Sequence, residues 1–311
     1  MQHRWVSVVV LCGVTAWMLG VTTPPAELNK DASHPEGTPL AVKGQTKCKR
    51  LTGLAVLGNG NLLACDYAGE VIKVISPDDR LVGTWKLTFR PTVVVVSGNS
   101  IYVGGEDALA KLDQNGREVK RALIGETGLP TGHTAGLAVD GEDLYASYAR
   151  IAGSSGGAIV RTNKDFADPK TIVTGLRGCC GNMDIAARDG VVWAAENAGH
   201  RVRGFDRDGK ETATWGKSDR VNVEGFGGCC NPMNLFFGSD GTLYTGESEP
   251  QRIKKYDTTG KYLGLVGYVG LGEVLHERCT TSRLAVSADG SKVYVADEVN
   301  SFIHVLERKT K

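Results

Sequence analysis

The sequence lacks the short motifs by which common catalytic and cofactor-binding proteins are identified. It has no C-x-x-C-H for covalent haem, no H-E-x-x-H for zinc, no G-x-S-x-G for a serine nucleophile and no glycine-rich phosphate loop. It also lacks an excess of one charge, because 36 Lys and Arg residues are matched by 35 Asp and Glu residues and form no basic tract. Nucleic-acid binding through counterion release is therefore excluded.

Long apolar runs are equally scarce, and the one that occurs lies at residues 5–21, after the basic residue Arg4. A short basic start, an apolar run and a polar, proline-containing continuation are typical of a signal peptide or an uncleaved N-terminal anchor. We therefore predict a leader at residues 1–22, a flexible linker at 23–37, and a periplasmic or secreted body that meets a membrane only through its N-terminal segment. Because the leader has no twin-arginine pair, the chain is expected to cross the membrane unfolded.

Glycine, in contrast, is abundant, with 41 residues placed at regularly spaced turns. Six segments share one plan, in which an apolar strand meets a Gly-containing turn and a second strand follows; they begin at Leu54, Val93, Leu137, Ile185, Leu235 and Leu284. Each continues into a third strand and another turn. Alternating residues punctuated by D-G, N-G and T-G indicate β-hairpins, and short strands at even spacing indicate radial repetition. The sequence thus predicts an all-β fold, a six-bladed β-propeller over residues 38–311.

The sixth unit differs from the others because it shows three strands instead of four. The apolar segment that begins at Thr38 precedes the first unit and would supply the missing strand. We expect this N-terminal strand to pair into the last blade and close the ring. Closure of this kind would cover two sheet edges that are otherwise exposed.

Two motifs resemble those of NHL-repeat proteins. An acidic residue followed at short distance by Arg-Val or Arg-Ile occurs at residues 196–202 and 247–253, and the segment GFGGCCNPMN at 225–234 is similar to one in exported bacterial NHL-repeat proteins. The resemblance implies the propeller fold without supplying catalytic residues, because one fold hosts many functions. Gluconolactonase-like propellers place polar metal ligands where this chain has Met183 and Met233, which disfavours a calcium-dependent lactonase.

The cysteines have an informative spacing. Cys180, Cys230 and Cys279 each lie five residues before the first aligned strand residue of their unit, and Cys48 lies one place off this register. First strands of propeller blades surround the channel and start on one face, and the end of the second strand, where Cys65 lies, returns to that face. All seven cysteines beyond the leader are therefore expected at one face: Cys48, Cys65, Cys179, Cys180, Cys229, Cys230 and Cys279.

Sulfur ligands gathered at one channel mouth predict a site for a thiophilic metal. Thiolate and thioether groups suit Cu(I), zinc or iron–sulfur clusters and suit Ca²⁺ poorly. Export in the unfolded state disfavours a preassembled iron–sulfur cluster, which leaves copper or another thiophilic metal. Such a metal would serve electron transfer with a redox partner, or copper handling with another exported protein. The candidate ligands share the cysteine register or lie close to it: Cys48, Cys179, Cys180, Cys229, Cys230, Cys279, Met183, Met233, His133 and His276.

Two other interpretations stay open at the level of sequence. Cysteines of an exported protein usually form disulfides, and pairs such as Cys48 with Cys279 or Cys48 with Cys65 would stabilise a propeller whose rim binds a protein or a glycan. A lactonase-like or lyase-like enzyme is the third interpretation, so the sequence does not decide whether the protein is an enzyme. The acids that end the second strands are expected to cap turns or pair with arginine: Asp66, Glu196, Glu247 and Asp297.

Overall fold

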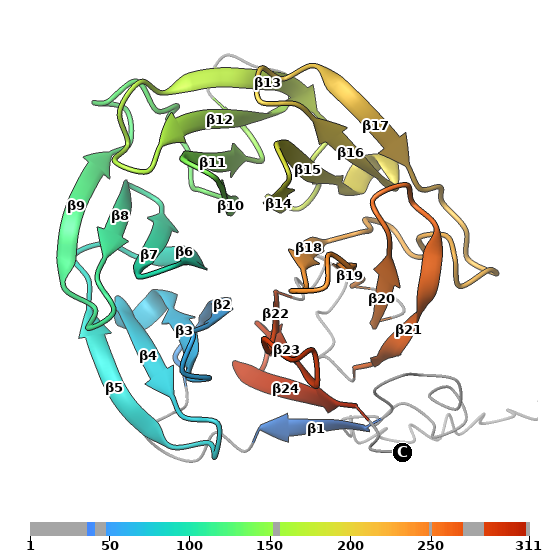
Figure 1. Cartoon of the computed structure of the whole chain (residues 1–311), viewed down its shortest axis with the longest axis horizontal. Helices are drawn as coiled ribbons and strands as arrows, with labels where there is room; N and C mark the ends of the chain where they lie inside the picture. Colours follow the sequence, from blue (N-terminus) through green and yellow to red (C-terminus); the bar gives the residue numbers. More distant parts are fainter. Residues whose placement is uncertain (1–35, 41–47, 152–155, 249–250, 270–282, 309–311) are drawn as a thin grey trace, which may run out of the picture.

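The computed structural model describes residues 36–40, 48–151, 156–248, 251–269 and 283–308. Six four-stranded antiparallel sheets stand around a central channel (Figure 1). The prediction of a six-bladed β-propeller is thus confirmed. Within the described ranges, no helix has the length and hydrophobicity needed to cross a bilayer.

Blades 1 to 5 each consist of four strands that are consecutive in the chain, with the first strand innermost. Blade 1 contains β2 (Leu51–Val56), β3 (Leu62–Asp66), β4 (Val71–Ile75) and β5 (Leu81–Lys86). Blade 2 contains β6 (Pro91–Ser97), β7 (Ser100–Gly105), β8 (Ala108–Leu112) and β9 (Glu118–Leu123). Blade 3 contains β10 (Gly136–Asp140), β11 (Asp143–Tyr148), β12 (Gly157–Asn163) and β13 (Lys170–Leu176).

The second half of the ring repeats this order. Blade 4 contains β14 (Ile185–Arg188), β15 (Val191–Glu196), β16 (Arg201–Phe205) and β17 (Glu211–Trp215). Blade 5 contains β18 (Asn234–Phe237), β19 (Leu243–Gly246), β20 (Arg252–Tyr256) and β21 (Tyr262–Tyr268). Blade 6 contains β22 (Leu284–Val286), β23 (Lys292–Asp297) and β24 (Phe302–Glu307). Short 3-10 turns follow two of the second strands, η3 (Tyr67–Gly69) and η4 (Asn197–Gly199).

The last blade is completed by a strand from the other end of the chain. Strand β1 (Glu36–Leu40) pairs antiparallel with β24, so the order in this sheet is β1-β24-β23-β22 (Figure 1). The predicted ring closure is therefore confirmed, although the strand begins two residues before Thr38. Because β1 covers the outer edge of β24, the two ends of the propeller hold one sheet together.

Removing β1 is expected to destabilise the whole ring. A chain that begins at residue 41 loses a ladder of five residue pairs and exposes the edge of β24. At about 0.5–1.5 kcal/mol per hydrogen bond, the loss of about five bonds lowers the free energy of unfolding by roughly 2–7 kcal/mol. Urea denaturation measures the change against a control chain that begins at residue 23 and keeps the strand. Equal midpoints for the two chains would contradict the closure.

The hydrophobic core is divided among the interfaces between blades. Each neighbouring pair of blades encloses its own cluster of buried side chains. At the outer rim, Trp85 lies one residue before the end of β5, and Trp215 is the last residue of β17. Each tryptophan packs on a turn glycine of the next blade. A Cβ atom added to Gly116 would lie 2.1 Å from Trp85, and one added to Gly260 would lie 2.5 Å from Trp215. These turns require glycine because φ is positive and the indole ring fills the side-chain space.

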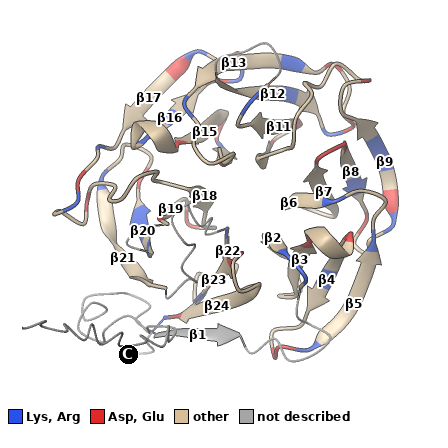
Figure 2. Cartoon of the chain, turned by 180° about the vertical axis from the view of Figure 1, so that it is seen from behind, with Lys and Arg blue, Asp and Glu red and all other residues tan. Residues whose placement is uncertain are grey.

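All six innermost strands start on the same face of the ring, because every blade has the same strand order. Seen from behind, Lys, Arg, Asp and Glu are found mainly on outer strands and loops, whereas the innermost strands are largely uncharged (Figure 2). The segments that lead into these strands carry the cysteines described next. The fold therefore brings loops from different blades to one mouth of the channel.

Candidate metal site

Three cysteine sulfurs from two neighbouring blades meet at this face of the ring. The Sγ atoms of Cys179, Cys180 and Cys230 all lie within 4.8 Å of one another. The Sγ atoms of Cys179 and Cys230 are 2.9 Å apart, and that of Cys180 is 3.5 Å from Cys179. Cys229 adds a fourth sulfur 3.4 Å from that of Cys230. A metal with thiolate bonds of about 2.3 Å can bridge sulfurs at this spacing after small adjustments.

Cys179 and Cys180 belong to a tight turn before β14. Cys180 has a φ of +57°, and Cys179 forms an isolated β-bridge with Asn182. The buried side chain of Asn197, in η4, accepts a hydrogen bond from the Cys179 N–H at 2.8 Å and donates to the Cys179 carbonyl at 3.3 Å. The Asn197 amide therefore fixes the backbone that carries the first sulfur, from inside the protein.

Cys230 is held by a second buried amide, that of Asn231. The Asn231 Nδ2 donates to the Gly227 carbonyl at 2.5 Å, and its Oδ1 accepts from the Ser248 N–H at 2.8 Å. The side chain of Cys230 is buried, that of Cys179 is half-buried and that of Cys180 is exposed. The sulfurs therefore form a path from the surface into the interface between blades 4 and 5.

The segment before Cys229 is anchored on a buried cation, Lys254 in β20. Its Nζ donates to the carbonyls of Val223 at 3.0 Å and Gly225 at 2.6 Å. Lys254 also forms an ion pair with Glu247, and both side chains are fully buried. Burial lowers the pKa of Lys254 to about 8, and the Glu247 carboxylate offsets part of this effect. Lys254 thus fastens the loop that leads to the cysteines onto blade 5.

Sequence reasoning missed Lys254, although a signal was present. Alternate residues of a strand face the same side, so Lys254 shares a face of β20 with Arg252 and Tyr256. Tyr256 is buried, and its hydroxyl donates to the Glu224 carbonyl at 2.8 Å. This signal is weak, because a lysine between an arginine and a tyrosine also fits an exposed strand face, and the tertiary contacts alone show that the face is buried.

Burial also acts on the sulfur group. It raises the pKa of the Cys179 thiol, the contact with Cys230 lowers it, and the neighbouring Cys180 and Cys229 raise it. Burial thus favours the protonated thiol. A bound metal cation would instead favour the thiolate, because the thiolate is the form that ligates.

Cys48 and Cys65 lie in the core on the two sides of blade 1. They do not belong to the described sulfur group. Cys48 packs in the cluster between blades 1 and 6, and Cys65 in the cluster between blades 1 and 2. Burial raises the pKa of Cys48 to about 12 and also raises that of Cys65. No disulfide joins Cys48 to Cys65. Both thiols therefore behave as protonated core residues.

The two methionines predicted as ligands have packing contacts in the structure. Met183 is fully buried and belongs to the cluster between blades 3 and 4. Met233 is also buried, and its Sδ accepts a hydrogen bond from Asn197 Nδ2 at 3.5 Å. These contacts favour a structural role for both side chains, and their ligation stays a prediction.

The predicted histidine ligands are placed only in part. His133 Nε2 lies 3.0 Å from the Gly181 carbonyl, next to Cys180, so it reaches the turn that carries the first two sulfurs. His276 and Cys279 lie outside the described residues. Their membership of the site therefore stays a prediction.

The acids that end second strands have the expected structural roles. Asp66 accepts from the backbone N–H groups of Lys49, Arg50 and Gly69. Asp297 caps the turn that follows β23 by accepting from the N–H groups of Val299 and Asn300. The other two pair with arginine: Glu196 with Arg201, and Glu247 with Arg252.

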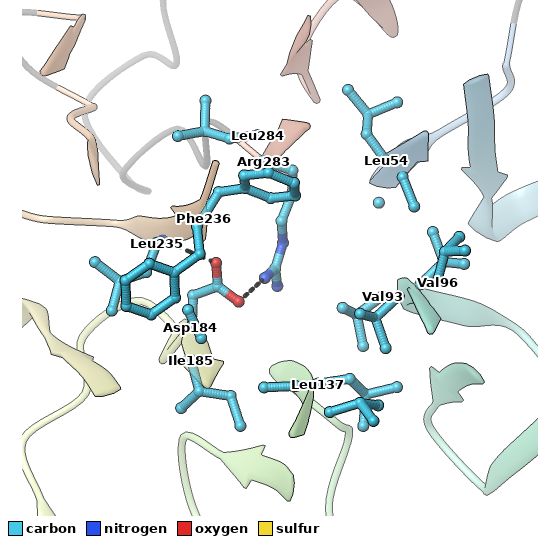
Figure 3. A pocket seen from close by; sticks show the side chains of 18 of the residues that line it. Leu54, Val93, Val96, Leu137, Asp184, Ile185, Leu235, Phe236, Arg283 and Leu284 are labelled. Carbon is cyan, nitrogen blue, oxygen red and sulfur yellow. Dashed lines mark hydrogen bonds and ion pairs between the residues drawn. The ribbon is translucent and has the colours of Figure 1, made fainter. Parts of the chain in front are cut away.

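An ion pair crosses the channel just inside the same mouth. Arg283 Nη1 donates to Asp184 Oδ1 at 2.8 Å (Figure 3). Arg283 Nη2 donates to the Ala135 carbonyl at 2.5 Å. Sequence reasoning missed this pair, but the aligned units hold its signal. Asp184 and Arg283 each lie one residue before the first residue of an innermost strand, so two opposite charges share one register.

The comparisons with known proteins identify the fold. No protein-family model and no curated protein sequence matches the chain. A solved protein of unknown function from Bacteroides thetaiotaomicron VPI-5482 is 16% identical, with a TM-score of 0.62 over 90% of this chain and 73% of that one. XC5397 from Xanthomonas campestris, a gluconolactonase, is 12% identical, with a TM-score of 0.64 over 92% of this chain and 94% of that one. A streptogramin B lyase is 14% identical, with a TM-score of 0.59 over 88% and 98%. Similarity at this level shows the propeller fold and does not transfer an activity.

Proposed function

We propose that this protein is an exported β-propeller that binds a thiophilic metal ion, in the first place Cu(I), at its inter-blade cysteine group. The observation that supports the proposal is that the Sγ atoms of Cys179, Cys180 and Cys230 lie within 4.8 Å of one another. Cys179 and Cys230 are 51 residues apart in the chain. Soft thiolate ligands select Cu(I) or zinc over Ca²⁺ and Mg²⁺. Buried amides on both sides hold the backbones that carry the sulfurs.

The exposure of the sulfurs suits the handling of an exchangeable ion. Cys180 is exposed, so it can be the first ligand that an incoming metal ion meets. Cys230 is buried and protects the bound ion from solvent. In this proposal Cys179, Cys180 and Cys230 supply the ligands, and Cys229 supplies a fourth sulfur next to them. The exposed end is where a redox partner or another exported protein would exchange electrons or copper.

A disulfide between Cys179 and Cys230 is the competing state, because their sulfurs are 2.9 Å apart. A disulfide bond measures about 2.05 Å, so a small movement would form it in an oxidising compartment. The protein would then be a disulfide-stabilised propeller with a binding role. The same two sulfurs cannot serve both states at once, which makes the alternatives separable.

The deciding experiment measures bound metal and accessible thiols on one sample of protein from the exported fraction. We expect about one thiophilic ion per chain and cysteines that are shielded from alkylation until a chelator removes the ion. A metal-free chain in which Cys179 and Cys230 resist alkylation until a reductant is added would refute the proposal. Peptide mapping by mass spectrometry assigns each protected cysteine.

Replacing Asn197 by leucine is expected to weaken Cu(I) binding while leaving every cysteine in place. The substitution removes both hydrogen bonds to the Cys179 backbone. Loss of a group that orients a metal ligand typically costs about 10–100-fold in affinity. Competition with a chromogenic Cu(I) chelator measures the change, and Asn99→Leu, at an exposed turn, is the control. Equal affinities for the two variants would show that Asn197 does not position the ligand.

A further inference from the structure

The central channel contains a cavity of about 250 Å³, lined mainly by apolar side chains, that the proposed metal site does not use. Its walls come from the innermost strands of all six blades and consist mainly of Val, Leu, Ile, Ala and Phe side chains (Figure 3). Asp184 and Arg283 are the two charged residues that line it in the described part of the chain. The cavity therefore differs from the polar, metal-ligating channel that a lactonase-like propeller would present.

The Asp184–Arg283 ion pair closes one end of this cavity. Arg283, from the start of blade 6, reaches across to the starts of blades 3 and 4 (Figure 3). A second, polar cavity of about 230 Å³ is also lined by Arg283, together with His133 and Cys180. The guanidinium and carboxylate thus separate a polar pocket on the cysteine face from the apolar cavity.

The other end of the cavity is open. Lining residues near the starts of the innermost strands, such as Leu137 and Ile185, are buried, whereas those further along, such as Val96 and Phe237, are partly exposed. A ligand would therefore approach from the face opposite the cysteines. Apolar side chains exposed in this way gain free energy when an apolar molecule replaces water.

The closed end holds a buried side-chain N–H group without a partner. Arg283 is 8% exposed, and its Nε has no hydrogen-bond partner among the described residues. The charge of Arg283 is already balanced by Asp184, whose remaining Oδ2 accepts from Asn234 Nδ2 and the Leu235 N–H, each at 3.1 Å. An anionic ligand would face the Asp184 carboxylate, so a neutral acceptor suits this end better.

From these observations we infer that the channel binds a small, neutral, apolar molecule with one hydrogen-bond acceptor, such as an aryl or alkyl ketone. The acceptor points to Arg283 and the apolar body contacts the six innermost strands. An apolar cavity of about 150 Å³ lined by Leu, Ile and Phe is large enough for benzene. A cavity of about 250 Å³ fits a molecule with two fused rings. This site is independent of the cysteine group and of any metal there.

The test uses three probes of one shape: 2-acetylnaphthalene, naphthalene and 2-naphthoate. Titration calorimetry on a chain that begins at residue 23 should show saturable binding of the ketone. We expect naphthalene to bind about tenfold more weakly, because a hydrogen bond contributes about 1.4 kcal/mol, and naphthoate to bind more weakly than both. Binding of the ketone should be unchanged in Cys230→Ala, which separates this site from the metal site.

Substitutions locate the binding. Val96→Trp fills the open end of the cavity and should abolish ketone binding, whereas Val82→Trp, at a position 54% exposed on the outer strand β5, should leave it unchanged. Ala187→Phe, on a different blade, is the second blocking variant in case Val96→Trp does not fold. The inference is overturned if the ketone does not saturate the wild-type protein, if both blocking variants bind it normally, or if naphthoate binds most tightly.

Discussion

Cys230→Ala is expected to lower the affinity for Cu(I) by at least about 100-fold, beyond what loss of a ligand-orienting group costs. Cys230 is the buried member of the group and the one whose sulfur lies close to the sulfurs of both Cys179 and Cys229. Its removal separates the ligands of blade 4 from those of blade 5. Competition with a chromogenic Cu(I) chelator under reducing, anaerobic conditions measures the affinity directly.

The matched control for this prediction is Cys65→Ala. Cys65 is also a buried cysteine, but it lies in the core between blades 1 and 2. Its replacement is expected to lower stability slightly and to leave Cu(I) affinity unchanged. If Cys230→Ala binds Cu(I) as tightly as the wild type, the inter-blade group is not the metal site. If Cys65→Ala loses affinity to the same extent, the effect of both variants is a general loss of structure.

Lys254→Met is expected to destabilise the protein by about 3 kcal/mol. Breaking a buried ion pair by removing one partner costs roughly 3–5 kcal/mol, and the lower end applies here because Arg252 still donates to Glu247 at 2.8 Å. The variant also loses the hydrogen bonds to Val223 and Gly225 that hold the loop before the cysteines. Urea denaturation measures the loss, and Cu(I) affinity should fall in parallel because the loop is loosened.

Two further variants distinguish this mechanism from a general loss of charge. Lys217→Met removes a lysine from the same segment between blades 4 and 5, and the side chain of this lysine is 73% exposed. The substitution should lower the free energy of unfolding by less than about 0.5 kcal/mol. Glu247→Gln, measured alone and combined with Lys254→Met, completes a double-mutant cycle, and the loss in the double variant should be smaller than the sum of the two single losses. Strictly additive losses would show that Lys254 and Glu247 do not interact and that the ion pair is not the cause.

The titration of Lys254 gives an independent check. Its pKa is about 8 in the folded protein and lower than the ordinary value of 10.5. Between these values the unfolded chain binds more protons than the folded one, so the free energy of unfolding should rise with pH from about 8 to 10. The contribution is absent in Lys254→Met, and the difference between the two pH profiles isolates it.

The blades and their closure were predictable because their signals are local. A glycine turn such as that at Gly116 needs a positive φ whatever surrounds it, and alternation within each strand follows from the pleat. The closing strand followed from counting, since the last unit had three strands. The repeated strand order therefore places the starts of all six innermost strands on one face of the ring.

The cysteine site was predictable only to that face. Register places Cys48, Cys180 and Cys230 at equivalent ends of their blades, but it does not determine toward which neighbour each thiol turns. The structure turns Cys230 toward Cys179 across the interface of blades 4 and 5, and it packs Cys48 among core residues shared with blade 6. Loop paths and side-chain packing make this choice, and neither is encoded in a periodic pattern.

By itself, then, the sequence determined the number of blades, the ring closure and the face at which Cys179, Cys180, Cys229 and Cys230 lie, because hairpin turns and strand alternation depend on neighbours in the chain. Only the tertiary structure decided which sulfurs meet, where Lys254 anchors the cysteine loop and how Arg283 crosses the channel to Asp184. Those contacts join residues from different blades or loops, and their geometry depends on how the completed sheets pack against one another.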